Sequence, residues 1–376
     1  MAEWDRTRPF ELEAITPAIL GSVAPTGADL TRYSESRYAD FSQAFESAAT
    51  EEILRHDPAG TVVLANDISE GPDFRRLAAR GFRVFTIFHV DVVDYVTALY
   101  FRGWIAPETT VRWYRYLRAL MPAMAGLVWA KQEAAVEASA GLIVPSPRMR
   151  DVILRCYPHC PPQKIHVLPW GNWHSTEPAD PAHVDALRAE FTVPRDAQVL
   201  LTLSRISPEK GQDLLLESLI EWEHRNTPSA PLYLFICGEA AFMQGQRHMA
   251  RLRTLAAKLR YVRVVFPGHV TGARKRAFFG LADLYVFPSR HESYGLTLME
   301  AMACGVPSVC LDTHGARSVM RPEFGAIVQR GELAATVMHL LQDSITRADM
   351  SAAARAFAGQ DRFSTRATQL AHSLQG

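Results

Sequence analysis

Residues 287–305 read Phe-Pro-Ser-Arg-His-Glu-Ser-Tyr-Gly-Leu-Thr-Leu-Met-Glu-Ala-Met-Ala-Cys-Gly and predict a strand end, a loop and a helix in succession. The apolar run at 284–287 is typical of a buried strand, which the following Pro-Ser pair closes. Residues 296–303 have helical composition, and Gly-Val-Pro at 305–307 is an exit signal for a helix. A strand-loop-helix unit of this kind indicates an α/β protein.

Two glutamates, Glu292 and Glu300, lie eight positions apart in this unit. Glu292 falls in the loop at the carboxyl edge of the predicted sheet, where open α/β sheets bind ligands, and Glu300 falls on the helix. The amides of Tyr294, Gly295 and Leu296 are expected at the helix N-terminus, where free N–H groups attract a phosphate. Carboxylates on both sides of a phosphate site suit a nucleotide sugar, which carries hydroxyls at each end of a diphosphate.

These residues resemble the motif of two glutamates separated by seven residues in retaining GT-B glycosyltransferases, in particular those of family 4. Without the resemblance, two glutamates are more simply interpreted as solvated surface residues. The resemblance implies a GT-B fold, which has two facing Rossmann-like domains and binds its donor in the cleft between them. It also implies that Glu292 contacts the transferred sugar, that Glu300 binds the ribose hydroxyls, and that Thr297 belongs to the donor-binding set.

The composition bounds the class of protein. The 376 residues are 48% apolar, as expected for a globular chain with two domains. Forty Lys and Arg balance forty Asp and Glu, so the overall charge does not favour a nucleic-acid partner. No apolar run approaches the roughly 18 residues that span a bilayer, and residues 1–25 lack the apolar core of a signal peptide. The expected location is the cytoplasm, with the inner face of its membrane as an alternative.

Cysteine usage argues against disulfides and against a metal. Five cysteines are an odd number in a chain of this length, so we expect reduced thiols. Cys156, His159 and Cys160 lie close together but have no second pair of ligands at a suitable spacing, so we expect no zinc site.

The first half of the chain alternates strand and helix signals, which predicts a parallel sheet. Strands are expected at 61–65, 83–88, 141–146 and 165–169. His89 follows the second strand, with Asp91 two residues later. A histidine in general is more often a core or surface residue, but residues 86–89 resemble the step from strand to histidine in the family's first domain. That resemblance implies that His89 faces the sugar and the acceptor.

Residues 100–129 are dense in aromatic residues and arginines. Arg112, Arg115 and Arg118 recur at a spacing of three and share one helix face, and Trp113 is expected on another. One interpretation is an ordinary amphipathic helix. The other is a surface that binds a lipid-linked or anionic acceptor at a membrane, in which case glutamates at the three arginines should weaken acceptor use or liposome binding but not nucleotide affinity.

The second half begins after residues 172–196, a polar segment with three prolines that is interpreted as a hinge between domains. A strand at 198–203 is followed by Arg205 and Lys210 in a loop at the carboxyl edge of the sheet. A guanidinium and an ammonium in such a loop suit a diphosphate. The loop resembles the family's Gly-Arg and Glu-Lys-Gly motif, with Ser204 in place of the glycine, which implies that Arg205 and Lys210 bind the donor phosphates.

Further strands are expected at 231–238, 262–270, 308–311 and 325–328, and helices at 332–358 and 365–374. The resemblance implies that the base of the donor lies against Gly238, His269 and Val270. It also implies that the last helix crosses back to the first domain, so the predicted division is 1–175, 176–358 and 359–376.

The resemblance thus implies transfer of a sugar from a nucleoside diphosphate with retention of α configuration, without a metal or another cofactor. The catalytic set is expected to be His89, Arg205, Lys210 and Glu292. Two alternatives stay open: a nucleotide-sugar isomerase or epimerase of the same fold, and a homologue that binds the nucleotide sugar without turnover. The second alternative is considered because no strand with a Gly-Gly loop is recognised before residue 61. We therefore expect that the first domain is incomplete and that the protein turns over poorly. The sequence does not identify the sugar, the base or the acceptor.

Overall fold

A computed structural model describes residues 11–23, 33, 35–91, 93–94, 97, 105–117, 123–241 and 244–375, with the backbone alone for 22, 23, 35, 115, 117, 123–125 and 375. The chain forms two compact units. Unit 1 comprises Met1–Trp170 and Ser364–Gly376, and unit 2 comprises Gly171–Phe363. The division predicted from the sequence falls after 175 and 358, and the two units divide the chain after Trp170 and Phe363.

Unit 1 is built on a four-stranded parallel sheet in the order β1-β2-β3-β4. Its strands are β1 (Val62–Ala65), β2 (Arg83–Ile87), β3 (Gly141–Val144) and β4 (Ile165–Val167). Its helices are η1 (Pro17–Val23), α3 (Glu35–Ile53), α4 (Phe74–Ala79), α6 (Pro107–Leu117), α7 (Ala123–Ala138), α8 (Pro147–Cys156), η3 (Pro162–Lys164) and α17 (Phe363–Gln375). The four predicted strands of this half are therefore present. The Arg83 guanidinium donates to the carbonyl of Leu374 over 3.2 Å, which ties the last helix to the edge of this unit.

Unit 2 is built on a six-stranded parallel sheet in the order β10-β9-β8-β5-β6-β7. Its strands are β5 (Gln198–Leu203), β6 (Leu232–Cys237), β7 (Val262–Gly268), β8 (Leu284–Phe287), β9 (Ser308–Leu311) and β10 (Gly325–Val328). Its helices are α9 (Pro181–Glu190), η4 (Pro208–Lys210), α10 (Gln212–Glu223), α11 (Gly245–Ala256), α12 (Gly272–Leu281), α13 (Leu296–Ala303), α14 (His314–Val319), η5 (Pro322–Phe324), η6 (Arg330–Glu332), α15 (Leu333–Gln342) and α16 (Ser344–Gln360).

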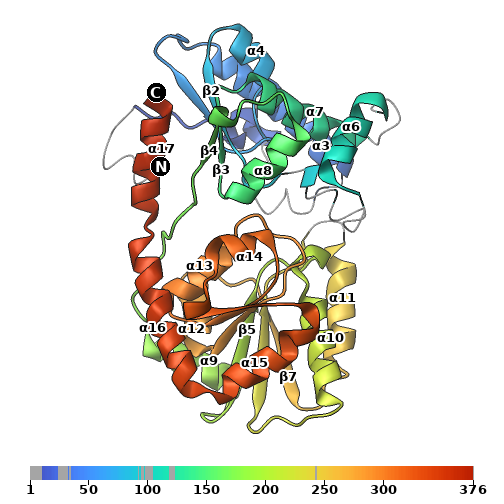
Figure 1. Cartoon of the computed structure of the whole chain (residues 1–376), viewed down its shortest axis with the longest axis vertical. Coiled ribbons are helices and arrows are strands. Elements are labelled where there is room, and N and C mark those ends of the chain that lie inside the picture. The colour runs from blue at the N-terminus through green and yellow to red at the C-terminus, as the bar shows by residue number, and fades with distance from the viewer. Residues whose placement is uncertain are drawn as a thin grey trace. The chain divides into compact units, whose positions relative to one another are not determined.

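The strand order of unit 2 contains a reversal. The chain starts at β5 in the middle of the sheet, runs outward through β6 to the edge strand β7, and returns to place β8 against the other side of β5. Helices α10 and α11 pack together on one face of the sheet, and α9 packs with α12 on the other (Figure 1). Every residue of β6 and of β8 is buried, as expected for strands covered on both faces. The carboxyl ends of β5 and β8 therefore flank a topological switch point, where open α/β sheets bind ligands.

Two segments contain helices whose ends were not predicted from the sequence. Residues 172–196, interpreted as a hinge, contain α9, which starts where Asp180 accepts a hydrogen bond from the amide of Ala182 at 2.9 Å. The Asp-Pro pair at its start is a usual N-terminal signal, so the sequence did carry this information. The helical composition expected over 332–358 is present as two helices, α15 and α16. They are separated at Asp343, whose side chain caps α16 by accepting from the amide of Thr346.

One carboxyl group is buried in unit 1 without a charged partner. Asp91 is 3% exposed, and its Oδ1 accepts from Gln132 Nε2 and from the amide of Asp94. Its Oδ2 has no hydrogen-bond partner within the described part of the chain. Burial raises the pKa of Asp91 to about 6, from its usual value of 3.8. The folded protein therefore holds a proton at this carboxyl over a pH range in which the unfolded chain has already released it.

We predict that Asp91→Asn stabilises the protein at high pH. Ionising this buried carboxyl lowers the free energy of unfolding. This cost is absent below pH 4, grows as the pH rises towards 6, and above pH 6 approaches its full value of about 3 kcal/mol. Urea denaturation between pH 4 and 8 should show the variant gaining that amount at pH 8 and little at pH 4. The exposed Asp151 provides the control, and parallel pH profiles for wild type and Asp91→Asn would contradict the prediction.

Candidate functional site

The switch point of unit 2 brings a cation and a carboxylate together. Lys210 ends the loop after β5, and Glu292 lies in the loop after β8. Their Nζ and Oε2 atoms are 2.6 Å apart, and the two side chains are only 15% and 18% exposed. Two residues that the sequence assigned separately to phosphate and to sugar thus form one ion pair. The sequence did not predict that they contact each other.

A glycine lets these two loops approach. Gly211 has a φ of +65°, and a Cβ atom at this position would lie 2.0 Å from the carbonyl oxygen of Pro288. The Pro288 carbonyl belongs to the loop that carries Glu292, so the residue after Lys210 must lack a side chain.

We predict that Gly211→Ala destabilises unit 2 by at least 3 kcal/mol, because it adds a backbone clash to the cost of a left-handed conformation. Gly272 is a matched control, since its φ is +54° and its Cβ position has nothing within 4 Å. Gly272→Ala should cost only about 1 to 2 kcal/mol. Equal shifts in the urea midpoints of the two variants would contradict the prediction.

The backbone amides at the N-terminus of α13 directly follow the loop that carries Glu292. Gly295 precedes the helix with a φ of +75°, and no side chain caps the first turn. The amides of the first turn of a helix have no partner within the helix and carry partial positive charge. The Tyr285 hydroxyl lies 2.8 Å from Thr297 Oγ1 and 3.0 Å from the carbonyl oxygen of Leu203, which fixes the start of α13 to the end of β5. Tyr294 is buried beside this turn, and Leu296 is exposed.

Glu300 lies one turn further along α13 and is buried. Its Oε1 accepts from Lys275 Nζ at 2.8 Å and lies 3.0 Å from His174 Nε2, without the geometry of a hydrogen bond to that ring. Its Oε2 is buried and has no partner among the residues that the structure describes. Burial tends to raise the pKa of Glu300, but His174 and Lys275 outweigh it and hold the pKa below its usual range. Glu300 is therefore a carboxylate with one oxygen held and the other able to accept.

Sequence reasoning missed both partners of Glu300. Lys275 lies on α12, in no recognisable motif, and His174 lies in the segment that was interpreted as a hinge. Neither residue has a local sequence signal that points to Glu300. Only the packing of the sheet and its helices brings the three together.

The residues expected at the base of the donor lie at the ends of β6 and β7. Gly238 has a φ of +148°, its amide donates to the carbonyl of Gly268 at 2.8 Å, and a Cβ there would lie 1.9 Å from the carbonyl oxygen of Ser204. Val270 is buried and His269 is exposed. The loop after β6 is thus packed directly against the loop that carries Arg205 and Lys210.

Arg205 is exposed in this loop. Its Nη2 is 3.9 Å from Oε1 of the buried Glu209, which also accepts from the Ser207 hydroxyl at 2.6 Å. Every predicted site residue except His89 therefore lies in unit 2, at the carboxyl edge of one sheet.

His89 lies in unit 1, at the carboxyl end of β2. Its Nε2 is 3.2 Å from Oδ1 of Asn66, which follows β1, and its ring centre is 5.2 Å from that of Trp170. Burial lowers the pKa of His89, which favours the neutral imidazole. The indole of Trp170 therefore lies against the ring of the predicted catalytic histidine.

The region expected to contact an acceptor is described only in part. Arg112 is exposed on α6, the side chain of Arg115 and the whole of Arg118 lie outside the described residues, and Trp113 is 47% exposed beside Arg112. Tyr116, one turn from both, is 82% exposed. The described face of α6 thus presents aromatic rings together with a cation.

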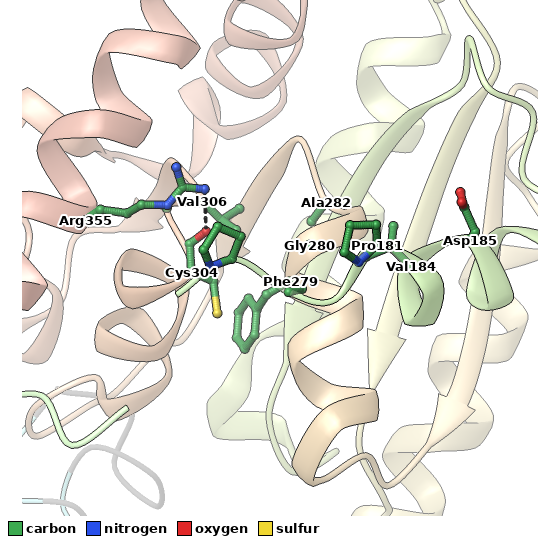
Figure 2. A pocket seen from close by; sticks show the side chains of 12 residues that line it. Pro181, Val184, Asp185, Phe279, Gly280, Ala282, Cys304, Val306 and Arg355 are labelled. Carbon is green, nitrogen blue, oxygen red and sulfur yellow. Dashed lines mark hydrogen bonds between the residues drawn. The ribbon is translucent and has the colours of Figure 1, made fainter. Parts of the chain in front are cut away.

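A separate pocket lies at the opposite edge of the sheet of unit 2. Its volume is about 320 Å³. Its wall includes Ala282, between α12 and β8, and Cys304, between α13 and β9. Figure 2 shows Arg355 reaching across the end of α13, where it donates to the carbonyl of Cys304 at 3.2 Å. None of the predicted site residues lines this pocket.

The described residues contain no group of three His, Cys, Asp or Glu side chains placed to hold a metal ion. None of their helices is long and apolar enough to cross a membrane.

Comparison with known proteins finds a family match in most of unit 2. Residues 184–357 match the family "Glycosyl transferases group 1". A D-inositol 3-phosphate glycosyltransferase of Thermobispora bispora is 30% identical over 219 residues, which are 57% of this chain and 50% of that protein. An alpha-maltose-1-phosphate synthase of Mycolicibacterium smegmatis is 29% identical over 196 residues, 50% and 48% of the two chains. The chain thus spans about half the length of the curated relatives it matches.

Solved structures resemble most of the chain. Anabaena Alr3699/HepE in complex with UDP-glucose aligns over 87% of this chain and 82% of its own, with a TM-score of 0.67 and 18% identity. WaaG, a glycosyltransferase involved in lipopolysaccharide biosynthesis, aligns over 92% and 84%, with a TM-score of 0.66 and 17% identity. At this identity the likeness concerns the fold. The predicted α/β fold of GT-B type, with two parallel sheets, is confirmed.

Proposed function

We propose that this protein is a retaining glycosyltransferase that moves a sugar from a nucleoside-diphosphate donor to an acceptor. The observation that carries the proposal is the meeting of Lys210, Glu292 and the N-terminus of α13 at the switch point, with the unpaired Oε2 of Glu300 one turn away. Cations and free amides suit a diphosphate, and carboxylates suit the hydroxyls of a sugar and a ribose.

The roles follow from the chemistry of these groups. Arg205, Lys210 and the amides at the start of α13 stabilise the negative charge that develops on the leaving diphosphate. Glu292 holds the sugar, Glu300 the ribose, and the backbone near Gly238, His269 and Val270 the base. Since positive groups of the protein supply this stabilisation, we propose that transfer needs no metal, so EDTA should leave the rate unchanged.

The carboxylate of Glu292 is held by Lys210, which lowers its nucleophilicity. We therefore favour departure of the diphosphate and attack of the acceptor on the same face of the sugar, in which no carboxylate attacks. In this mechanism the neutral imidazole of His89 serves on the acceptor side of the reaction.

The comparisons support the class of reaction. Residues 184–357 match glycosyl transferases of group 1, the relatives of Thermobispora and Mycolicibacterium are named as a glycosyltransferase and a sugar-phosphate synthase, and HepE was solved with UDP-glucose. These relatives also favour transfer over an isomerase or a protein that only binds.

A panel of nucleotide sugars tests the proposal. A donor at one hundred times its dissociation constant should stabilise the protein by about 2.7 kcal/mol, which a thermal shift detects. The stabilising donor is then incubated with and without candidate acceptors, and the products are separated. Conversion of the donor alone into an isomer would support an epimerase, and stabilisation without any product would support a binding protein.

We also propose that α6 contacts a lipid-linked or anionic acceptor, because Trp113 and Tyr116 are exposed beside Arg112. We predict that the triple variant Arg112→Glu, Trp113→Ala, Tyr116→Ala binds anionic liposomes at least tenfold more weakly and keeps its nucleotide affinity. Tyr261, 46% exposed in unit 2, provides a control for loss of an exposed aromatic ring. Unchanged sedimentation with liposomes and unchanged acceptor kinetics would return α6 to an ordinary amphipathic helix.

A further inference from the structure

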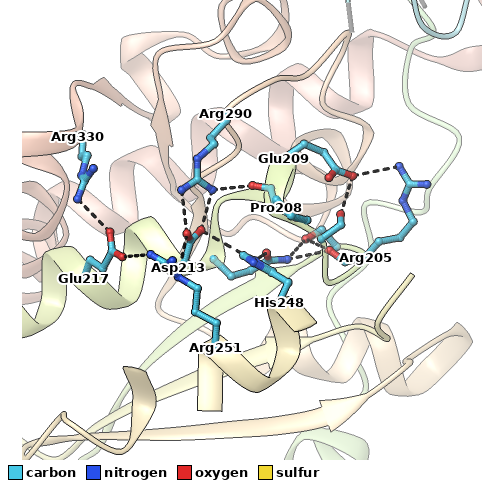
Figure 3. Close-up of polar contacts among 12 residues, drawn as sticks. Arg205, Pro208, Glu209, Asp213, Glu217, His248, Arg251, Arg290 and Arg330 are labelled. Atoms are coloured by element: carbon cyan, nitrogen blue, oxygen red, sulfur yellow. Dashed lines mark hydrogen bonds and ion pairs between the residues drawn. The ribbon is translucent and has the colours of Figure 1, made fainter. Parts of the chain in front are cut away.

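One guanidinium joins the two loops at the switch point. Arg290 lies two positions before Glu292, and its Nη1 and Nη2 donate to Oδ1 and Oδ2 of Asp213 at 2.7 and 2.9 Å. Its Nη1 also donates to the carbonyl of Pro208 at 2.6 Å, and its backbone amide donates to the carbonyl of Glu209 at 2.8 Å. Figure 3 shows this side chain pointing from the loop after β8 towards the loop after β5.

The carboxylate that receives Arg290 is a fixed anchor. Asp213 lies in the first turn of α10 and is buried, with Arg251 Nε at 3.6 Å and His248 Nε2 at 3.9 Å (Figure 3). Burial tends to raise the pKa of Asp213, but Arg290, assisted by His248 and Arg251, holds the pKa below its usual range. A bidentate pair with a carboxylate on a rigid helix fixes the orientation of the guanidinium as well as its position.

The loop after β5 is held from its other side by a side-chain amide. Gln212 Nε2 donates to the Ser204 hydroxyl at 2.9 Å and to the carbonyl of Arg205 at 2.8 Å. Gln212 Oε1 lies 3.3 Å from His248 Nε2. Gln212 thus holds the start of the loop that carries Lys210. Arg290, anchored on the neighbouring Asp213, contacts the same loop further along, at the carbonyls of Pro208 and Glu209.

We propose that Arg290 is a positioning residue for sugar transfer, because it fixes the separation between Lys210 on one loop and Glu292 on the other. This inference rests on the proposed function. Lys210 is assigned to the diphosphate and Glu292 to the sugar, so the bond that breaks lies between the groups that they bind. A misplacement of about 1 Å between such groups costs on the order of a hundredfold in rate.

The geometry separates this role from a simple need for positive charge. Arg290 makes three side-chain hydrogen bonds in two directions, to Asp213 and to Pro208. A lysine keeps the charge but cannot reproduce the planar bidentate contact. Arg290→Lys should therefore fail in transfer almost as badly as Arg290→Ala.

Arg251 offers a matched control on the same carboxylate. Its guanidinium comes from α11 and pairs with Asp213 and, at 2.6 Å, with Glu217. Replacing Arg251 removes a comparable charge from Asp213, and among the described residues Arg251 makes no hydrogen bond or ion pair with the loop that carries Glu292.

The test uses the full chain with the donor found in the panel. Calorimetry gives the dissociation constant of the nucleoside diphosphate, and initial rates at saturating donor give kcat. We expect kcat to fall 30- to 100-fold in Arg290→Ala and Arg290→Lys, with the dissociation constant changed by less than threefold. Arg251→Ala should keep both quantities within threefold of wild type. The double variant Asp213→Asn, Arg290→Ala should lower kcat little more than either single variant, because each single change already removes the same contact.

Three results would overturn the inference. Wild-type kcat in Arg290→Lys would show that charge alone suffices, and this variant decides the matter if Arg290→Ala does not fold. A loss of nucleotide affinity in proportion to the loss of kcat would make the role merely structural. An equal loss of kcat in Arg251→Ala would assign the effect to the charge on Asp213. Failure of the proposed function is distinct, because it appears in the wild-type protein as absence of transfer with every donor tested, and the inference then falls with it.

Discussion

Glu292→Ala is expected to lower the rate of sugar transfer by 100- to 1000-fold while leaving the affinity for free nucleoside diphosphate unchanged or slightly higher. A preorganised polar group that acts on the reacting centre typically contributes this much to kcat. Affinity for the diphosphate should not fall. Glu292 pairs with the ammonium of Lys210 at 2.6 Å, so its removal leaves that ammonium free to bind a phosphate. Calorimetry with nucleoside diphosphate beside initial rates with the sugar donor measures both quantities.

Glu292→Gln tests the origin of the effect, because it keeps the shape of the side chain and removes its charge. We expect a rate between those of wild type and Glu292→Ala. A variant Glu292→Ala that loses nucleotide affinity and rate in equal proportion would show that Glu292 binds the nucleotide and not the sugar.

Glu300→Ala is expected to weaken binding of the nucleoside diphosphate and of the sugar donor alike, by tenfold or more. A hydrogen bond to a charged group contributes about 1.5 to 3 kcal/mol, and the unpaired Oε2 of Glu300 is the atom that would accept it. The two glutamate variants should therefore differ in kind, one in kcat and the other in affinity.

A deoxynucleoside diphosphate sharpens this second test. Wild type should bind the deoxy form more weakly than the ribose form, and Glu300→Ala should bind both forms equally. The exposed Glu323 in unit 2 is the control for loss of a glutamate, and Glu300→Gln serves if the alanine variant is unstable with Lys275 and His174 left unpaired. Equal nucleotide affinity in Glu292→Ala and Glu300→Ala would contradict the assignment of Glu300.

The elements that position this site were predictable because their signals are local. The apolar run of β8, the Gly-Val-Pro exit after α13 and the loop between them lie within one short stretch, and β5 with its loop is as compact in sequence. Residues at the carboxyl ends of parallel strands meet at one edge, so Lys210 and Glu292 could be placed near each other from the sequence. Their assigned roles in binding and catalysis stay predictions.

What the sequence did not predict depends on contacts between distant residues. His174 lies 126 positions before Glu300 in the chain, and Lys275 lies 25 positions before it. Arg290 and Asp213 are 77 positions apart. No local pattern encodes such contacts. The missed start of α9 differs, since the Asp-Pro signal at 180–181 was present and was outweighed by the polar, proline-containing composition around it.

The reversal of strand order in unit 2 also has a consequence for folding. Because β8 pairs with β5 only after the chain has travelled out through β6 and β7, Lys210 and Glu292 meet across 82 positions. Long loops must close before such contacts add stability, so pairings of this kind form slowly. During synthesis the chain emerges N-terminus first, and β5 waits with one side unpaired until residues beyond 287 have left the ribosome. The unpaired edge of β5 is therefore exposed to aggregation until β8 has been made.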